Sequence, residues 1–406
     1  KMNRNIIKFV KNGYGVVPFV CDVVVTNYLL NFQCNECQHI PTARTNIHIL
    51  NTAIKETTMQ QVIITHKIAD ELTKALVSGN YDKVFTFTDK NTRLHCLPII
   101  NSCEATRNAY HITIDASDTN KTLESAVHVW RELSDNGCTR HSCMVNVGGG
   151  MVTDLGGFAA SCFKRGIDFI NVPTTLLAMV DASVGGKTGI NFNGLKNEIG
   201  VFKDANTVFI DTIFLKTLDH QNILSGYAEM LKHSLISDDK IWARHLLFDF
   251  DKLDLNELSL MIADSIELKR RIVTEDPHEN GIRKALNLGH TIGHALESLA
   301  MQKGKPLLHG YAIAYGLVGE LFLSCALKNF PTTKMRQTTR FVFDNYGRPE
   351  FSCKDYDKLF SLMLHDKKNT GYKINFTLLS DVGEVRINQT ASKELVFEAL
   401  DFLRES

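Results

Sequence analysis

Short apolar runs alternate with amphipathic stretches over the first half of the sequence, beginning near Met59. Six runs rich in β-branched and aromatic residues predict strands, at Gln61–Thr65, Lys83–Phe87, His111–Asp115, Met144–Val147, Asp168–Val172 and Thr207–Ile210. Apolar positions at helical spacing predict a helix over Lys121–Asn136. This repetition of strand, helix and strand predicts a parallel sheet with helices on both faces.

Long helical patterns follow Asp211, from about Leu215 to Met363. Nearer the C-terminus, Ile374–Leu378 and Val385–Ile387 flank a turn and predict a hairpin, and Lys393–Leu403 predicts a last helix. We therefore expect a nucleotide-binding α/β domain at 59–211 and a mostly helical domain at 212–406. Ligands of open α/β sheets bind at the carboxyl ends of the strands, so we expect the site between the two domains.

Composition narrows the class of protein. The 406 residues carry 45 Lys+Arg and 45 Asp+Glu, with 44% hydrophobic and 22% charged residues. This balance is typical of a globular protein and excludes a disordered, collagen-like or basic nucleic-acid-binding chain. Apolar runs are shorter than the ~18 residues of a membrane span, so no membrane segment is expected. Ten scattered cysteines favour a reducing, cytoplasmic location.

The first 58 residues form an extension of uncertain status, which we expect to be poorly ordered. Basic residues precede an apolar run at 16–25, but Asp22 interrupts that run and no small-residue cleavage site follows. Cys34 and Cys37 form a lone CxxC without a second pair, which argues against a structural zinc site.

Two glycine-rich turns are candidates for binding a phosphorylated ligand. Gly148-Gly149-Gly150 follows a buried strand, where the backbone can approach a pyrophosphate at a helix N-terminus; a tight turn is the alternative. Asp89 with Asn91, at another strand end, could hold a ribose hydroxyl, or Asp89 could cap a helix. Thr174 and Thr175 likewise suit either a helix cap or a phosphate contact.

The second turn runs from Asp181 to Gly189 and is followed by Gly194-Leu195-Lys196-Asn197. Its lysines, Lys187 and Lys196, suit a phosphorylated or polyol substrate, although the spacing is not that of a Walker A loop. A solvated charged loop is the alternative reading.

Four polar residues recur at spacings of four, three and four: Arg283, Asn287, His290 and His294. On one continuous helix they would project within about 60° of one another, with Leu288, Ile292 and Leu296 on the other side. Such a narrow polar stripe predicts that the helix lines a site. Gly289 and Gly293 would allow a close approach by another backbone or by a ligand.

A metal centre is the chemistry that these histidines suggest. Glu229 lies in a helical pattern and His309 precedes an apolar helix; one carboxylate and two imidazoles with an open position form a catalytic zinc shell. Spacing alone leaves open whether His290, His294 or both are ligands. His233 is a weaker competitor, and capped or surface histidines are the alternative.

Taken together, these motifs resemble the sugar-phosphate cyclases, and among them the bacterial 3-dehydroquinate synthase family. The resemblance runs from about Met59 to the C-terminus. It rests on Gly148–Gly150 with Asp154, Phe163–Gly166, Val172–Leu177, Val180–Thr188, Lys196-Asn197, Ser225–Lys232 and Leu286–His294.

The resemblance implies a Rossmann-like NAD-binding domain followed by a helical metal- and substrate-binding domain. It implies conversion of 3-deoxy-D-arabino-heptulosonate 7-phosphate to 3-dehydroquinate and phosphate by a lyase of the shikimate pathway. NAD and a divalent metal, zinc or cobalt, would be the cofactors. The hydride taken by NAD would be returned after phosphate elimination, before ring opening and aldol closure. A cytoplasmic homodimer that binds neither nucleic acid nor membrane is also implied.

Site residues carry over by position in the same way. Glu229, His290 and His309 match the metal ligands, and His294 a substrate-side histidine. Catalytic and substrate-contacting positions are matched by Asp181, Lys187, Asn197, Lys232, Lys269, Arg283 and Asn287, by Arg165 across a dimer interface, and by Lys367 or Lys368. The NAD side is matched by Asp89, Asn91, Asp118, Lys121, Gly149, Gly150, Asp154, Thr174, Thr175, Lys187 and Lys196. Asp118 departs from the family's usual Glu.

Three other functions compete with this hypothesis. A valiolone-type or 2-deoxy-scyllo-inosose synthase resembles the NAD and metal motifs but departs from Lys269, Arg283, Asn287 and His294. A glycerol-type dehydrogenase has a similar two-domain layout, but it would reduce NAD in net turnover. A binding module without catalysis would need neither the metal triad nor the basic residues.

Overall fold

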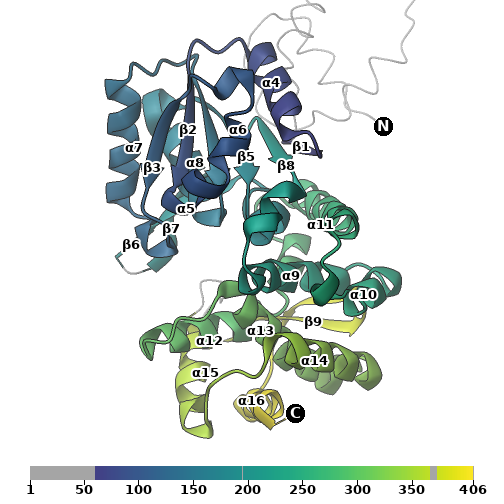
Figure 1. Ribbon diagram of the computed structural model, residues 1–406. Helices are drawn as coiled ribbons and strands as arrows, with labels where there is room; N and C mark the ends of the chain where they lie inside the picture. The colour runs from purple at the N-terminus through teal and green to yellow at the C-terminus, as the bar shows by residue number, and fades with distance from the viewer. Residues whose placement is uncertain (1–59, 194, 366–372, 406) are drawn as a thin grey trace, which may run out of the picture. The chain divides into compact units, whose positions relative to one another are not determined.

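The computed structural model describes residues 60–193, 195–365 and 373–405 (Figure 1). The described residues all belong to one compact unit, Met59–Ser406. The expectations for the basic N-terminal segment and for Cys34 and Cys37 therefore lie outside the described residues. The domain boundary expected near residue 211 stays a prediction.

A six-stranded parallel sheet forms the N-terminal half of this unit, in the order β1-β8-β5-β4-β2-β3. Each predicted strand is present, with bounds shifted by a residue or two. The strands are β1 (Gln61–Ile64), β2 (Val84–Asp89), β3 (Tyr110–Ile114), β4 (Cys143–Gly148), β5 (Asp168–Pro173) and β8 (Thr207–Ile210). All residues of β4 and β8 are buried, as expected of central parallel strands covered on both faces.

Helices pack on this sheet and position its carboxyl edge. They are α4 (Ile68–Gly79), α5 (Lys90–His95), α6 (Leu97–Ile100), α7 (Leu123–Asp135) and α8 (Gly150–Cys162). Helix α7 begins after Thr122, whose side chain accepts a hydrogen bond from the Ser125 amide, within the predicted range. Helix α8 packs against β4 and β5 through an apolar face that includes Val152 and Leu155.

One hairpin was not predicted. The second glycine turn, with Gly185 and Gly186 at φ of 103° and 66°, leads into the antiparallel strands β6 (Lys187–Phe192) and β7 (Leu195–Phe202). All of β7 is exposed, so it lacks the alternation of buried and exposed positions that reveals a half-buried strand. Lys187 therefore begins a strand and is not part of a charged loop.

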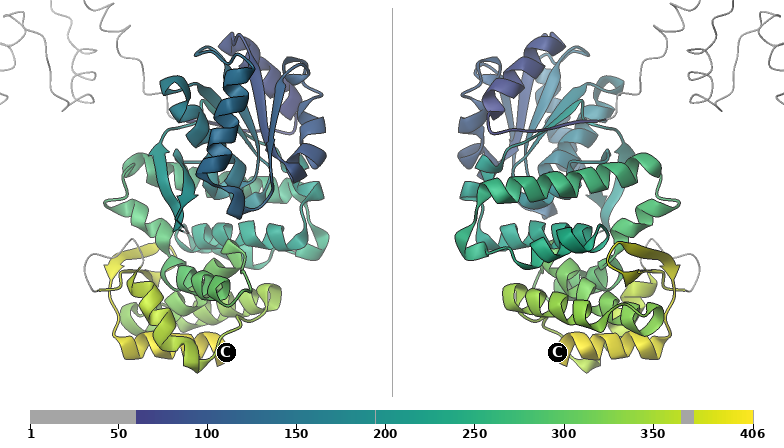
Figure 2. Two further views of the ribbon diagram at one scale, coloured as in Figure 1. Left: turned by 90° about the vertical axis from the view of Figure 1, so that its left-hand side faces the viewer. Right: turned by 90° about the vertical axis from the view of Figure 1, so that its right-hand side faces the viewer.

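The C-terminal half is mostly helical, as predicted. Its helices are α9 (His220–Leu235), α10 (Asp239–Leu246), α11 (Leu255–Glu275), α12 (His290–Gln302), α13 (His309–Lys328), α14 (Thr332–Tyr346), α15 (Tyr356–Leu364) and α16 (Lys393–Glu405). The predicted hairpin is present as β9 (Phe376–Asp381) and β10 (Glu384–Gln389). Figure 2 shows α9 and α11 between the sheet and the helices α12–α16.

Helix α13 is the core of the helical half and packs against α9, α12, α14 and α16. It is long and apolar enough to cross a membrane, but 72% of its most apolar window is buried inside the protein, as in a core helix. Its N-terminus approaches α9 closely: a Cβ at Gly310 would lie 1.8 Å from the Ser225 carbonyl oxygen. Only glycine permits this contact, which brings His309 to α9.

Candidate active site and metal centre

Three side chains predicted as metal ligands converge on one point. Glu229 lies in the middle of α9 and is fully buried, whereas His290 and His309 are the first residues of α12 and α13. The Nε2 atoms of His290 and His309 lie 3.4 and 3.5 Å from Glu229 Oε1. Side chains from three helices therefore face one another, as the metal-centre hypothesis requires.

The hydrogen bonds around this point suit a cation. The His290 Nδ1 donates to the Leu288 carbonyl at 3.1 Å, and the His309 Nδ1 lies 3.2 Å from Glu297 Oε2. These bonds place the ring protons on Nδ1 and direct the Nε2 lone pairs toward Glu229, the arrangement found around metal-ligating histidines. Among the described residues, Glu229 Oε1 is buried without a hydrogen-bond partner. The residues present therefore fit a divalent metal.

Charge around His309 points the same way. Burial lowers the pKa of His309, but the neighbouring carboxylates of Glu229 and Glu297 raise it to about 10. Two carboxylates thus attract positive charge to this imidazole. A divalent ion at the same place would supply this positive charge and displace the proton from the imidazole.

His294 lies one turn beyond His290 on α12. Its ring centre is 5.2 Å from that of His290 and 5.8 Å from that of His309. One nitrogen of each of the three imidazoles lies within 4.8 Å of the others. Distance alone therefore leaves His294 as either a ligand or a substrate-side residue, while Glu229 faces His290 and His309.

Two buried ion pairs adjoin the metal centre. Lys232 binds Glu229 Oε2, one turn along α9, and Lys269 of α11 lies 2.5 Å from Asp181 Oδ1. Burial raises the pKa of Asp181, but the charges of Lys269 and Lys232 hold it far below its usual range. Burial lowers the pKa of Lys269. The structure thus places two ammonium groups in a water-poor site, where they can meet an anionic substrate.

The ammonium groups of Lys232 and Lys269 also argue against His233 as a metal ligand. One ligand atom each of Asp181, Glu229 and His233 lies within 4.8 Å of the others, but two lysines already neutralise both carboxylates. A cation there would be repelled. The His233 Nδ1 lies 2.5 Å from Ser265 Oγ, and burial lowers its pKa to about 3, so the ring is neutral. His233 therefore fits a packed polar contact better than a metal ligand.

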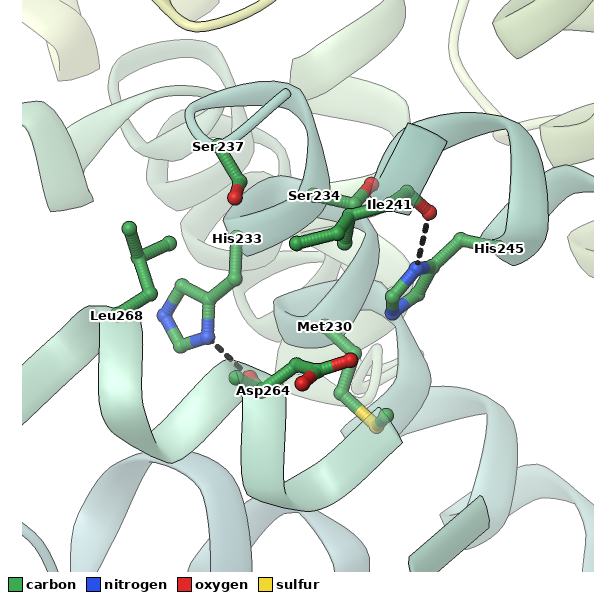
Figure 3. A pocket seen from close by; sticks show the side chains of 9 residues that line it. Met230, His233, Ser234, Ser237, Ile241, His245, Asp264 and Leu268 are labelled. Carbon is green, nitrogen blue, oxygen red and sulfur yellow. Dashed lines mark hydrogen bonds between the residues drawn. The ribbon is translucent and has the colours of Figure 1, made fainter. Parts of the chain in front are cut away.

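A small cavity of about 10 Å³ lies beside His233, room for about one water molecule. Figure 3 shows His233 and His245 at its wall. The His245 Nδ1 donates to the Ile241 carbonyl at 2.8 Å, and burial lowers its pKa to about 4. The cavity is too small for a substrate and lies apart from the three candidate metal ligands.

The continuous helix expected from Arg283 to His294 is wrong. A 3₁₀ helix spans Ile282–Asn287, Gly289 turns the chain with φ of 79°, and α12 begins at His290. A Cβ at Gly289 would lie 2.9 Å from Leu317 Cδ2 and 3.1 Å from the Ile313 carbonyl oxygen. The close approach expected of Gly289 is thus made by α13, and this turn breaks the helix.

Arg283 and Asn287 nevertheless stay near the glycine turn and the lysines. Arg283 donates to the Pro277 carbonyl at 2.6 Å and to the Gly185 carbonyl at 3.4 Å. Glu279 lies 2.6 Å from the Lys187 ammonium and 2.8 Å from the Asn287 amide nitrogen. One carboxylate therefore connects two predicted substrate residues.

The predicted NAD side lies at the carboxyl ends of β2, β4 and β5. Gly149 precedes α8, whose first turn has no side-chain cap, so its amides can meet an anion. A Cβ at Gly149 would lie 3.1 Å from Thr175 Cγ2, and one at Gly150 3.2 Å from Ala182 Cβ. Side chains at Gly149 and Gly150 would therefore crowd their neighbours, whereas the bare backbone leaves space for a ligand. The residues present fit the pyrophosphate of NAD.

Asp89 and Thr175 show the helix-capping alternative. Asp89 accepts a hydrogen bond from the Thr92 amide at 2.8 Å and caps α5, on which Asn91 lies exposed. Thr175 Oγ1 accepts from the Ala178 amide at 3.2 Å, and Thr174 is buried beside it. Capping does not use all the lone pairs of these oxygens, so the same residues can cap a helix and also bind NAD.

Lysines connect the hairpin to both halves. Buried Lys121 lies 2.5 Å from Asp154 Oδ2 and 2.5 Å from Asn197 Oδ1. Lys196 of β7 lies 2.7 Å from Glu297 and 3.6 Å from Asp118. The structure therefore brings a predicted NAD-side lysine to the carboxylate that holds His309.

Arg165 is not brought to this site. Arg165 is exposed in a left-handed turn after α8, with φ of 69°, and makes no hydrogen bond or ion pair with the other site residues in the described chain. Lys367 and Lys368 lie outside the described residues.

The sequence reasoning missed Glu279, Glu297 and Ser265. Glu279 and Glu297 contact the predicted site residues Lys187 and His309, and Ser265 contacts the packed His233. For Glu297 a signal was present: it lies seven positions after His290, two helical turns along the same face of α12.

A parallel sheet with a phosphate-binding turn, joined to helices that gather a carboxylate and imidazoles, is the architecture of sugar-phosphate cyclases and related metal-dependent dehydrogenases. The solved 2-deoxy-scyllo-inosose synthase, complexed with carbaglucose-6-phosphate, NAD+ and Co2+, superposes with a TM-score of 0.72 at 25% identity, covering 84% of this chain and 95% of that one. The valiolone synthase ValA of Streptomyces hygroscopicus, with NAD+ and Zn2+ bound, has the same TM-score at 21% identity, covering 86% and 97%.

Sequence comparison identifies the family. Models described as 3-dehydroquinate synthase N-terminal and C-terminal match residues 111–225 and 226–369. The chain is 53% identical over 347 residues to the 3-dehydroquinate synthase of Parabacteroides distasonis, covering 86% of this chain and 98% of that protein. It is 36% identical to that of Campylobacter jejuni, covering 78% and 92%. The chain belongs to the 3-dehydroquinate synthase family, so the predicted family and fold are confirmed.

Proposed function

We infer that this chain converts 3-deoxy-D-arabino-heptulosonate 7-phosphate to 3-dehydroquinate and phosphate. The observation that carries the inference is the buried Glu229 Oε1, which has no hydrogen-bond partner among the described residues and faces the Nε2 atoms of His290 and His309. It occurs in a chain that shares 53% identity with a 3-dehydroquinate synthase along almost the whole of that enzyme.

NAD and a zinc or cobalt ion are the cofactors of this proposal. Gly149, Gly150 and the first turn of α8 would hold the pyrophosphate, and Glu229, His290 and His309 the metal. When bound, NAD supplies a transient oxidation of the substrate, and the metal polarises the oxygen at which that oxidation occurs. The remaining NAD contacts would come from Asp89, Asn91, Asp118, Lys121, Asp154, Thr174, Thr175, Lys187 and Lys196.

The substrate carries a phosphate and a carboxylate, so its site needs cations although the chain is neutral overall. Lys187, Lys269 and Arg283 would supply them. Lys187 is half exposed and paired with Glu279, so phosphate oxygens can replace that carboxylate. Buried Lys269, fixed by Asp181, presents its charge from a defined position, which favours orientation of one small substrate through several steps.

Proton handling falls to groups at the metal centre. His294 lies beside both predicted metal-ligating imidazoles and would exchange a proton with the substrate. Lys232 keeps Glu229 ionised, because its charge offsets burial and holds the pKa of Glu229 at about 2. Asn287 and Asn197 would orient substrate hydroxyls, and Lys367 or Lys368 would contact an anionic group.

We propose a homodimer in which Arg165 reaches the partner's site. Its exposed guanidinium and left-handed backbone, held apart from the other site residues, support a role outside its own subunit. Cytoplasmic location is supported by the cysteines, since the seven in the described residues are all free thiols.

The test mixes the protein, NAD, zinc and the heptulosonate phosphate, and follows inorganic phosphate together with NADH absorbance. We expect phosphate release without lasting NADH. Stoichiometric NADH accumulation would instead indicate a dehydrogenase. His309→Ala should abolish metal-dependent turnover; unchanged turnover of this variant after metal stripping would contradict the proposed centre.

A further inference from the structure

A second cavity lies in the helical half, away from the candidate metal ligands. It occupies about 460 Å³ and is lined by residues from the C-terminal part of α12, the first turns of α13 and the end of α14. Leu296, Leu299 and Leu307 give it an apolar wall. Its volume falls in the range of small-molecule sites, about 300–1,000 Å³.

Three tyrosine rings also line the cavity. The rings of Tyr311 and Tyr346 meet edge to face at 5.1 Å. The Tyr315 hydroxyl donates to the Tyr346 carbonyl at 2.8 Å, and the Tyr346 hydroxyl donates to the Leu224 carbonyl at 2.9 Å. Because two of the three rings are held by their hydroxyls, the wall is pre-organised for a flat, apolar ring.

The rim is basic but offers one cation for a ligand. Lys303 is paired with Asp355 at 2.9 Å and Lys305 with Glu350 at 2.7 Å. Arg348 lies with its guanidinium carbon 4.6 Å from the centre of the Phe343 ring and forms no ion pair with any described residue. A guanidinium in this state can bind a carboxylate through two parallel hydrogen bonds.

The Tyr311 hydroxyl adds a second polar contact. This side chain lines the cavity, is partly exposed and makes no hydrogen bond within the described part of the chain. It can therefore donate to the same carboxylate or to a ring substituent. The cavity thus combines aliphatic and aromatic walls with one unpaired cation and one available hydroxyl.

We propose that this cavity is a binding site for an aromatic monocarboxylate, separate from the active site. The planar ring lies between the leucines and the tyrosines, and the carboxylate binds Arg348. A sugar phosphate fits poorly, because the leucine wall offers no partners for hydroxyl groups. A dianion fits poorly as well, because the neighbouring lysines are already paired.

The cavity also touches both sides of a proposed metal ligand. Leu307 and Tyr311 line it, and His309 lies between them in the sequence and faces Glu229. A bound ligand would therefore restrain the segment that presents His309. This consequence rests on the proposed function, whereas binding itself does not.

Calorimetric titration of the full chain with 2-naphthoate tests the binding site, with 2-naphthamide as the neutral counterpart. We expect saturable binding of the acid, weaker binding of the amide, and about tenfold weaker binding of the acid to Arg348→Gln, the loss of one charge-assisted pair. Arg340→Gln, on α14 shortly before Arg348 and paired with Asp344, is the matched control and should bind as the unchanged protein does.

A second variant fills the cavity. Ala300→Phe places a ring in the space between the walls and should abolish naphthoate binding while phosphate release continues. Absence of saturable binding below about 10 mM acid would overturn the proposal. So would equal binding by the unchanged protein, Arg348→Gln and Ala300→Phe, since the acid would then occupy another site. The naphthoate-binding measurements do not depend on turnover, so failure of the cyclase assay leaves them unaffected.

The effect on the metal centre is measured by chelator competition for zinc, with and without saturating 2-naphthoate. We expect bound naphthoate to change the affinity for zinc. Bound zinc should change the affinity for naphthoate by the same factor, because coupling between two binding sites is reciprocal. Zinc affinity unchanged by a bound acid would overturn the coupling to His309.

Discussion

The carboxylate of Glu297 offers a sharp test of how the metal centre is built. Its Oε2 lies 3.2 Å from His309 Nδ1, and its Oε1 lies 2.7 Å from the Lys196 ammonium. Burial raises the pKa of Glu297, but the hydrogen bond from His309 and the charge of Lys196 bring it to about 2, so it is ionised at neutral pH. Glu297→Gln keeps the size and removes the charge.

The expected loss follows from the two contacts. Removing a carboxylate that orients a metal-ligating histidine typically lowers metal affinity 10- to 100-fold, or about 1.4 to 2.8 kcal/mol. The pair with Lys196 contributes less, because that lysine side chain is 50% exposed and exposed pairs give about 0–1 kcal/mol. Glu297→Gln should therefore weaken zinc binding at least tenfold, and Lys196→Gln less than about fivefold.

Zinc affinity is measured by competition with a chromogenic chelator near neutral pH, alongside the melting temperature. Glu267→Gln is the matched control, because Glu267 is an exposed glutamate paired with Arg270 on α11. Unchanged zinc affinity in a folded Glu297→Gln protein would refute the argument that this carboxylate orients His309. Equal losses in the Glu297 and Lys196 variants would instead assign the effect to the ion pair.

Three further outcomes are expected. Gly310→Ala should destabilise the fold by about 3 kcal/mol or more and release zinc, whereas Gly347→Ala, with φ of 70° and open space, should cost only about 1 kcal/mol in urea unfolding. Burial lowers the pKa of His245 from 6.5 to about 4, so unfolding takes up a proton on this ring between these pH values. His245 alone should therefore lower the free energy of unfolding by about 3 kcal/mol as pH drops through them. His245→Asn should flatten that slope and exposed His66→Asn should not. Lys269→Ala should lower turnover about 100-fold with NAD affinity unchanged by calorimetry, and weaker NAD binding would contradict its placement with the substrate.

The inner strands of the sheet were predictable because they are buried on both faces. Runs such as Met144–Val147 have few polar residues, and turns rich in glycine bound them, so local sequence identifies both the strand and its end. The hairpin of β6 and β7 was not predicted, because β7 is exposed along its whole length and lacks a continuous apolar run like those of the inner strands.

The candidate site was predictable in residue type but not in geometry. Periodicity placed His290 and His294 on one helix, which is right for these two residues, but extended that helix back to Arg283. Gly289 was itself the signal against this, because glycine with positive φ commonly ends or begins a helix. The contacts of Glu279 with Lys187 and of Glu297 with Lys196 span 92 and 101 residues, so only the folded chain reveals them.

The two carboxylate oxygens of Glu229 have different contacts in the proposed metal centre. Lys232 lies one turn after Glu229 on α9 and binds Oε2, which directs Oε1 toward His290 and His309. Each imidazole is turned in the same direction by a partner on its Nδ1. Every predicted ligand atom is therefore oriented by a contact from within its own half of the chain. The centre can thus be set before a ligand binds, and Lys196 of the hairpin, bonded to Glu297, connects it to the NAD-binding half.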